Sequence, residues 1–72
     1  TARDRSLVTV ASFAARSQLD ALALHVARAL KAGLTAADMV EAMTHLAFYA
    51  GWPRATASLA VVNRVCHAGA DA

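Results

Sequence analysis

Apolar residues recur along this chain at the three- and four-residue spacing of amphipathic helices, and the pattern predicts an all-α fold. Residues 4–16 follow this spacing, although the run from Leu7 to Val10 is rich in strand-forming residues. Because the spacing continues well beyond the length of a short strand, we expect a helix there, with Asp4 as its N-cap. Its inward positions are predicted to be Leu7, Val10, Ala11, Ala14 and Ala15.

A second helix is predicted to begin after Ser17 and to end at Gly33. Ser17 is a favourable N-cap, and Asp20 three residues later completes an approximate capping box. Gly33 can adopt the left-handed conformation that commonly closes a helix. The face expected to be buried consists of Leu22, Val26, Ala29 and Leu30.

The third predicted helix has the clearest beginning and end. Thr35 is a good N-cap, and Asp38 places a carboxylate beside the positive end of the helix. Gly51 suits a C-terminal cap and Pro53 cannot continue a helix, so this helix should end near Ala50.

A fourth helix is expected from Pro53 to His67, with the tail from residue 68 fraying. It is apolar nearly all round, which predicts burial on more than one side, within the fold or between subunits. The connections are short, so successive helices should be antiparallel neighbours. We therefore expect residues 1–72 to form one small antiparallel domain of about four helices.

The composition adds an expectation of self-association. A chain of 72 residues is near the size at which one core only marginally offsets the entropy lost on folding. With 58% hydrophobic and 17% charged residues, one copy should carry more apolar surface than it can bury, so we expect a homo-oligomer. No membrane partner is expected, because charged residues interrupt every long apolar run. Thr1 is not an initiator methionine, which leaves open that an N-terminal segment precedes this domain.

Charge and cysteine content exclude two further classes of function. The net charge is +2, but the seven Lys and Arg residues are spread from Arg3 to Arg64 without a stripe interleaved with aromatic residues. A nucleic-acid partner is therefore not expected. The single cysteine, Cys66, excludes an internal disulfide and a CxxC motif, and this usage favours a reducing cytoplasm.

The strongest indication of chemistry is a polar stripe on the third helix. Glu41, His45 and Tyr49 follow one another at intervals of one helical turn, so a carboxylate could orient the imidazole for proton transfer. Two other interpretations remain open. His45 could be a hydrogen-bonded core or interface residue, or Glu41 and His45 could ligate a metal if His25 supplied a third ligand.

Other candidate residues are equally ambiguous. His25 has Arg28 on the same side of the second helix, and it is either a site residue or a packing residue. Tyr49 and Trp52 are packing groups or walls of a pocket at the end of the third helix. Cys66 should be inert within an apolar helix.

Three separated motifs resemble the carboxymuconolactone decarboxylase family. They are RSLVTVA at 5–11, LxLHxxxALxxGLT at 22–35 and HLAFYAGWP at 45–53. The resemblance implies an all-α fold that assembles as trimers or hexamers. It also implies a small-molecule substrate, no cofactor or metal, and a place in the catabolism of aromatic compounds.

Within this resemblance, the thiol peroxidase branch is disfavoured. That branch uses CxxCxxxH with an upstream glutamate. Aligned on His25, its two cysteines fall at Gln18 and Ala21, and its glutamate falls at Ser6. The chain therefore resembles the decarboxylase-like branch, and peroxidase activity is not expected.

The resemblance implies a lyase that removes carbon dioxide from a small carboxylated lactone or a related enolisable acid. Such a reaction leaves an enolate, which needs a stabilising positive charge and then a proton at carbon. The predicted catalytic residues are His45, Glu41 and His25, with either histidine as the acid. The predicted substrate-binding residues are Arg5, Tyr49 and Trp52. The alternative is a non-catalytic helical module of the same family.

Overall fold

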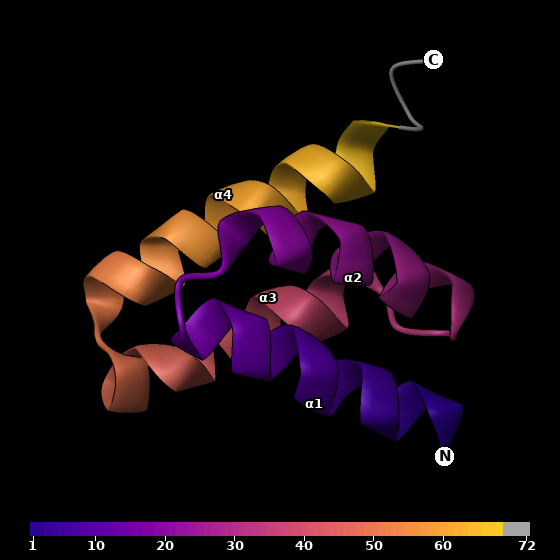
Figure 1. Cartoon of the computed structure of the whole chain (residues 1–72), viewed down its shortest axis with the longest axis horizontal. Coiled ribbons are helices and arrows are strands. Elements are labelled where there is room, and N and C mark those ends of the chain that lie inside the picture. Colours follow the sequence, from indigo (N-terminus) through magenta and orange to yellow (C-terminus); the bar gives the residue numbers. More distant parts are fainter. Residues whose placement is uncertain (69–72) are drawn as a thin grey trace.

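The computed structural model describes residues 1–68, which form four helices and no strand (Figure 1). The helices are α1 (Ala2–Ala15), α2 (Leu19–Lys31), α3 (Ala36–Ala50) and α4 (Trp52–Ala68). The all-α prediction is therefore confirmed. Residues 69–72, which belong to the tail expected to fray, lie outside the described part of the chain.

The four helices alternate in direction along the chain (Figure 1). Helix α1 packs mainly against α2 and α3, and α4 packs against the same two helices. The prediction that successive helices are neighbours therefore holds for α1 with α2 and for α3 with α4. It is wrong for α2 and α3, which lie across the core from each other. The short link between them is held by Leu34, whose side chain is buried in the core.

The ends of α3 follow the prediction closely. The Thr35 hydroxyl accepts a hydrogen bond from the Asp38 backbone N–H at 3.0 Å, and the Asp38 carboxylate accepts one from the Thr35 N–H at 3.0 Å. This is a complete capping box. At the other end Gly51 has φ +96°, and its N–H donates to the Ala47 carbonyl at 3.2 Å. Such a φ favours glycine.

The ends of α1 differ from the prediction. Thr1, not Asp4, is the N-cap, and its hydroxyl accepts from the Asp4 N–H at 3.1 Å. Ser17 does not cap α2 either. It has φ +56° and donates its N–H to Ala14, while the Gln18 N–H donates to Phe13, a pair of bonds that closes α1 as a Schellman motif. Closing α1 in this way prevents Ser17 from adopting the extended conformation of an N-cap.

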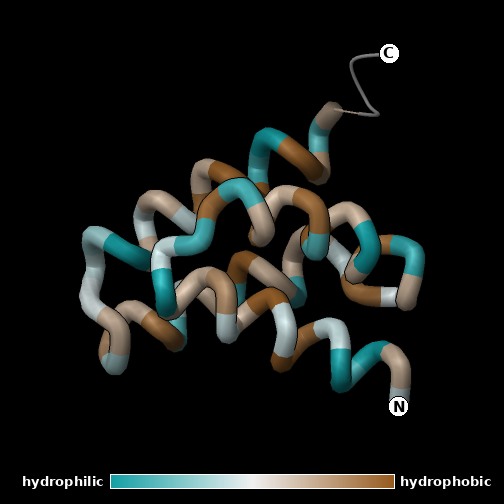
Figure 2. Tube along the Cα trace, viewed as in Figure 1, coloured by the Kyte–Doolittle hydropathy of each residue, from teal (hydrophilic) through white to brown (hydrophobic). Residues whose placement is uncertain are grey.

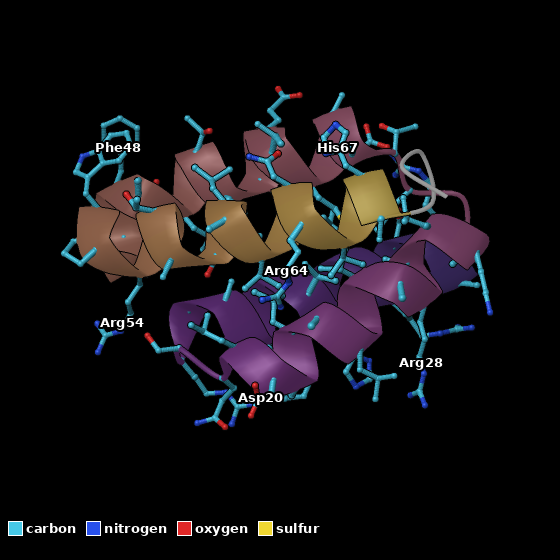
Figure 3. The ribbon with its side chains drawn as sticks, turned by 90° about the horizontal axis from the view of Figure 1, so that it is seen from above. Asp20, Arg28, Phe48, Arg54, Arg64 and His67 are labelled. Atoms are coloured by element: carbon cyan, nitrogen blue, oxygen red, sulfur yellow. The ribbon has the colours of Figure 1, made fainter. Side chains whose placement is uncertain are left out.

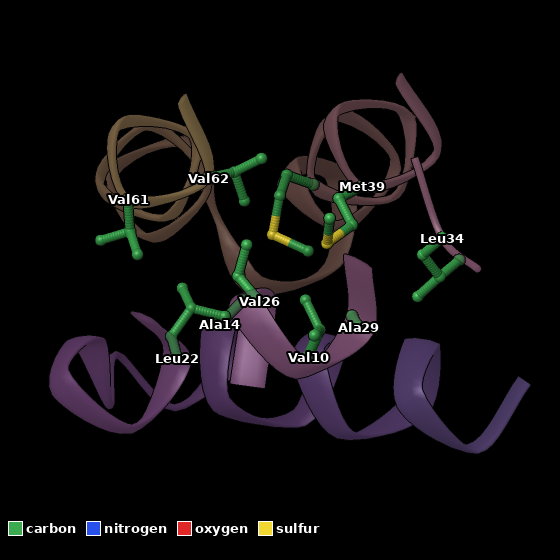
Figure 4. Packing of buried hydrophobic residues seen from close by; sticks show 10 residues of the cluster. Val10, Ala14, Leu22, Val26, Ala29, Leu34, Met39, Val61 and Val62 are labelled. Carbon is green, nitrogen blue, oxygen red and sulfur yellow. The ribbon is translucent and has the colours of Figure 1, made fainter. Parts of the chain in front are cut away.

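All four helices contribute to one hydrophobic core (Figure 4). Its buried members are Val10, Ala14, Leu22, Val26, Ala29, Leu34, Met39, Met43, Val61 and Val62. Leu30 was also predicted to be buried, but it is 36% exposed. The face of α2 that meets the core consists of the other three predicted residues, Leu22, Val26 and Ala29. Helix α4 buries one face, while Ala60 is exposed in the single chain.

Hydrophobic and hydrophilic residues are mixed along each helix (Figure 2), and the buried ones recur about once a turn, as on α3 at Met39, Met43 and Ala47, which is the pattern of amphipathic helices. Within residues 1–68, no helix combines the length and the apolar character required to cross a membrane.

Candidate functional site

Two open grooves flank the N-terminal half of α1, and four of the six predicted site residues line them, two in each groove. The α1/α2 groove has a volume of about 390 Å³ and is lined by Ala2, Arg5, Ser6, Thr9, His25 and Arg28. The α1/α3 groove has a volume of about 410 Å³ and is lined by Arg3, Leu7, Asp38, Glu41, Ala42 and His45. The structure thus brings His25 together with Arg5, and Glu41 together with His45. It does not bring the two histidines into one groove.

The α1/α2 groove is cationic. Arg5 is contributed by the first turns of α1, and His25 and Arg28 lie one turn apart on α2. Among residues 1–68, no carboxylate lines the groove and neither guanidinium forms an ion pair. Two unneutralised guanidinium groups beside an imidazole favour an anionic ligand, because arginine presents a fixed set of donors that match carboxylate geometry.

The ring of His25 is held by an aromatic neighbour from α1. The Phe13 and His25 rings are stacked, with centroids 4.9 Å apart and planes inclined by 24°. The guanidinium carbon of Arg16 lies 5.2 Å from the centroid of the same Phe13 ring. Sequence reasoning missed Phe13 as a site residue. The available signal was its position one helical turn after Thr9, on the face of α1 that meets α2.

Hydroxyl groups complete the polar lining of the α1/α2 groove. The Thr9 hydroxyl donates to the Arg5 carbonyl at 3.0 Å, which leaves its lone pairs available to a ligand. Ser6 lies in the groove at the position where the peroxidase branch would have its glutamate. Cys66 lines neither groove, and burial raises the pKa of its thiol.

In the α1/α3 groove, the arginine is already neutralised. Arg3 Nη2 lies 3.2 Å from Asp38 Oδ2, and Arg3 Nη1 lies 3.5 Å from Asp4 Oδ1. The hydrogen bond from the Thr35 backbone is the main cause that lowers the pKa of Asp38, and the Thr35 hydroxyl and the nearby Arg3 charge act in the same direction. Arg3 therefore joins α1 to the start of α3.

Glu41 and His45 share this groove, but no polar interaction joins them in the single chain. Both are exposed, and no hydrogen bond or ion pair connects them within residues 1–68. The His45 ring is instead near Tyr49, with centroids 5.1 Å apart and planes inclined by 50°. The stripe thus has the predicted alignment, but the carboxylate does not orient the imidazole.

Tyr49 and Trp52 lie outside both grooves, on an exposed aromatic face at the junction of α3 and α4. Phe48 contacts Trp52 edge-on, with ring centroids 5.7 Å apart. Tyr49 is 76% exposed, Phe48 74% and Trp52 54%. These rings are accessible to another molecule, but they do not line a pocket with either histidine.

His25 lies in a different groove from Glu41 and His45, so these three side chains do not come together as the metal site that the sequence left open. Within residues 1–68, no cluster of three or more His, Cys, Asp or Glu side chains has the geometry of a metal site.

The fold and the groove define a small all-α protein with a histidine and arginines in an open site and no paired cysteines. The model of the carboxymuconolactone decarboxylase family matches residues 1–64, and the chain belongs to this family. No curated protein and no solved structure gives a significant match.

Proposed function

We propose that the protein is a carboxymuconolactone decarboxylase-like enzyme that binds a small carboxylated lactone or a related enolisable acid in the α1/α2 groove. One observation carries the proposal: Arg5, His25 and Arg28 line a single groove to which residues 1–68 contribute no carboxylate. Family membership supports the reaction class. Two cationic side chains provide affinity for the acid, and an adjacent imidazole provides the group that transfers a proton.

The proposed chemistry assigns a role to each side chain. The bond between the departing carboxyl carbon and the substrate breaks, carbon dioxide leaves, and the electron pair stays on the substrate as an enolate. Arg5 and Arg28 stabilise the enolate oxygen and hold an acidic group that remains on the substrate, since binding the departing carboxylate would oppose its loss. His25, as the imidazolium, then protonates the enolate at carbon and recovers its proton from solvent.

Phe13 acts as a positioning residue in this scheme. Its ring stacks on His25, so it restricts the orientation of the imidazole without contacting the substrate itself. Restricted orientation favours proton transfer because the donor must lie within hydrogen-bonding reach of the carbon that accepts the proton.

Carbon dioxide release from a panel of carboxylated lactones tests the proposal. His25→Gln should lower turnover by about 100-fold or more, as expected for loss of a positioned acid, while the helical content stays unchanged. Arg64→Glu, an exposed change on α4, is the control and should leave turnover unaffected. Turnover by the wild type that survives His25→Gln would contradict the assignment.

A non-catalytic member of the same family is the second candidate. The observation that favours it is that no ion pair joins Glu41 and His45 in residues 1–68 of the single chain. This candidate predicts that acids bind to the α1/α2 groove and are released unchanged. We further propose that the protein acts in the cytoplasm as a homo-oligomer, a trimer or hexamer, without nucleic-acid or membrane partners.

A further inference from the structure

We propose that the outer face of α3 from one copy covers the α1/α2 groove of a second copy, and that Glu41 and His45 complete the site there. This face, the α3 stripe, consists of Glu41, His45 and Tyr49. The inference rests on the proposed function, because it takes the completed groove to be the substrate site.

Charge complementarity favours this pairing. The α1/α2 groove carries Arg5 and Arg28, and no carboxylate from the described part of the chain lines it. In the α1/α3 groove, Arg3 is neutralised by Asp38, whereas Glu41 has no ion-pair partner within residues 1–68. Glu41 is thus an unneutralised acid on a face away from the cationic groove, whereas Asp20, the other acid without an ion pair in residues 1–68, lies on α2 itself. Pairing opposite potentials guides association and disfavours other orientations.

Exposed apolar side chains accompany the charges on both surfaces. Tyr49 and Phe48 on α3 are 76% and 74% exposed. Beside the groove, Val8 on α1 is 69% exposed and Leu24 on α2 is 52% exposed. Leu24 lies one helical turn before Arg28, so each surface places an exposed apolar side chain near a charged one. Large apolar patches rimmed by charged residues are typical of protein–protein contacts.

A single chain cannot make this contact with itself. Figure 3 shows Phe48 of α3 and Arg28 of α2 at opposite edges of the bundle. The two grooves also lie on different sides of α1, since one is shared with α2 and the other with α3. A second copy is therefore required to place Glu41 and His45 next to His25.

The helical spacing permits a defined register. Glu41 and His45 are separated by one turn of α3, and Arg28 and Leu24 by one turn of α2. If the two helices cross in opposite directions, Glu41 meets Arg28 of the partner subunit while His45 meets Leu24 and His25 of the partner subunit. The partner's Arg5 then stays unpaired for the acidic group of the substrate, and the partner's Arg28 keeps further N–H donors for the enolate oxygen. The two contacting surfaces are different, so the contact is heterologous, and it forms a closed ring such as a trimer if the rotation between copies closes.

Charge reversal tests the contact by sedimentation velocity. The wild type should associate at micromolar concentration. Glu41→Arg and Arg28→Glu, each alone, should weaken association by at least about tenfold, because like charges then face each other. A mixture of the two variants should associate better than either variant alone. When α3 of a Glu41→Arg copy meets the groove of an Arg28→Glu copy, the two substituted side chains have opposite charges. When α3 of an Arg28→Glu copy meets the groove of a Glu41→Arg copy, the native pair of Glu41 and Arg28 re-forms.

Several outcomes would overturn the proposal: a monomeric wild type, unaffected assembly of Glu41→Arg, or a mixture that associates no better than its components. Arg64→Glu has the same charge change as Arg28→Glu at an exposed site on α4, so equal disruption by it would also count against a specific contact. Circular dichroism establishes that each variant is folded. Acid binding by the Glu41→Arg monomer, which keeps the whole α1/α2 groove, tests the proposed function separately from the assembly.

Discussion

Phe13 and His25 are stacked across the interface of α1 and α2, with ring centroids 4.9 Å apart and an interplanar angle of 24°. This contact connects the packing of the first two helices to the orientation of the imidazole in the α1/α2 groove. The energy of the contact is measurable apart from any catalytic activity.

A double-mutant cycle with Phe13→Leu and His25→Gln should show a coupling energy of about 1 kcal/mol in the free energy of unfolding, as is typical of aromatic pairs. Denaturant unfolding of the two single variants and the double variant gives this value. The control pair is Phe13→Leu with Ser12→Ala, because Ser12 is exposed and should not be coupled to the ring contact. Fully additive effects of Phe13→Leu and His25→Gln would show that the stacking does not position His25.

Ser58→Ala should stabilise the protein by about 1 kcal/mol. Ser58 is fully buried, and its hydroxyl has no hydrogen-bond partner within residues 1–68. The space it faces, bounded by Ala14, Met43 and Ala55, has no room for a water molecule. Ser12→Ala in the exposed part of α1 measures the gain from helix propensity alone. A Ser58→Ala protein that gains no more than Ser12→Ala would contradict this interpretation of the hydroxyl.

Asp38 should make stability depend on acid pH. Its pKa is lower in the folded state, mainly because its carboxylate accepts from the Thr35 backbone. The stabilisation is therefore present above the ordinary carboxyl pKa of about 3.9 and is lost as the pH falls through the lower folded-state value. Asp38→Asn should lower the melting temperature at neutral pH. Below pH about 4, the melting temperature of this variant should fall less steeply with pH than that of the wild type.

Arg3→Gln separates the capping box from the ion pair. It should have the smaller effect, since the Thr35 hydrogen bonds remain and exposed ion pairs contribute little. The melting temperatures of Asp38→Asn and of the wild type are measured at several acid pH values. If both fall with the same slope as the pH is lowered, Asp38 is not the source of the pH dependence.

Cys66 should have no redox function. Burial raises the pKa of its thiol, and it lines neither groove. Its reaction with a thiol reagent at neutral pH should be slower than that of a free thiol, because less thiolate is present. Peroxide consumption with a dithiol reductant should stay at background in the wild type and in Cys66→Ser. Peroxidase turnover that Cys66→Ser abolishes would refute this prediction.

Local sequence rules succeeded where no second motif competed for the same residues. The Thr35 and Asp38 pair predicted a capping box, and both of its hydrogen bonds are present. Ser17 and Asp20 have the same spacing, but Ser17 is used to close α1. Which motif forms depends on how the chain reverses between two packed helices, and a local pattern does not contain that information.

The candidate site shows a similar limit. The spacing of His25 and Arg28 placed both on one side of α2, and the structure has both in one groove. The separation of His25 from His45 follows from α1 lying between the grooves, which depends on contacts between distant segments. The stacking of Phe13 on His25 is likewise a contact between two helices, and periodicity within one helix could not reveal it.

NMR of the histidine side chains shows whether the α1/α2 groove binds a small acid next to His25. Titration with succinate, a small dicarboxylate, should shift the His25 ring signals saturably. His67, whose Nδ1 lies 2.7 Å from the Asn63 carbonyl oxygen on α4, should serve as an unshifted internal reference. Arg5→Gln should weaken the binding by about tenfold or more. A His25 signal that does not move, or that moves no more than that of His67, would show that the α1/α2 groove does not bind a small acid next to His25.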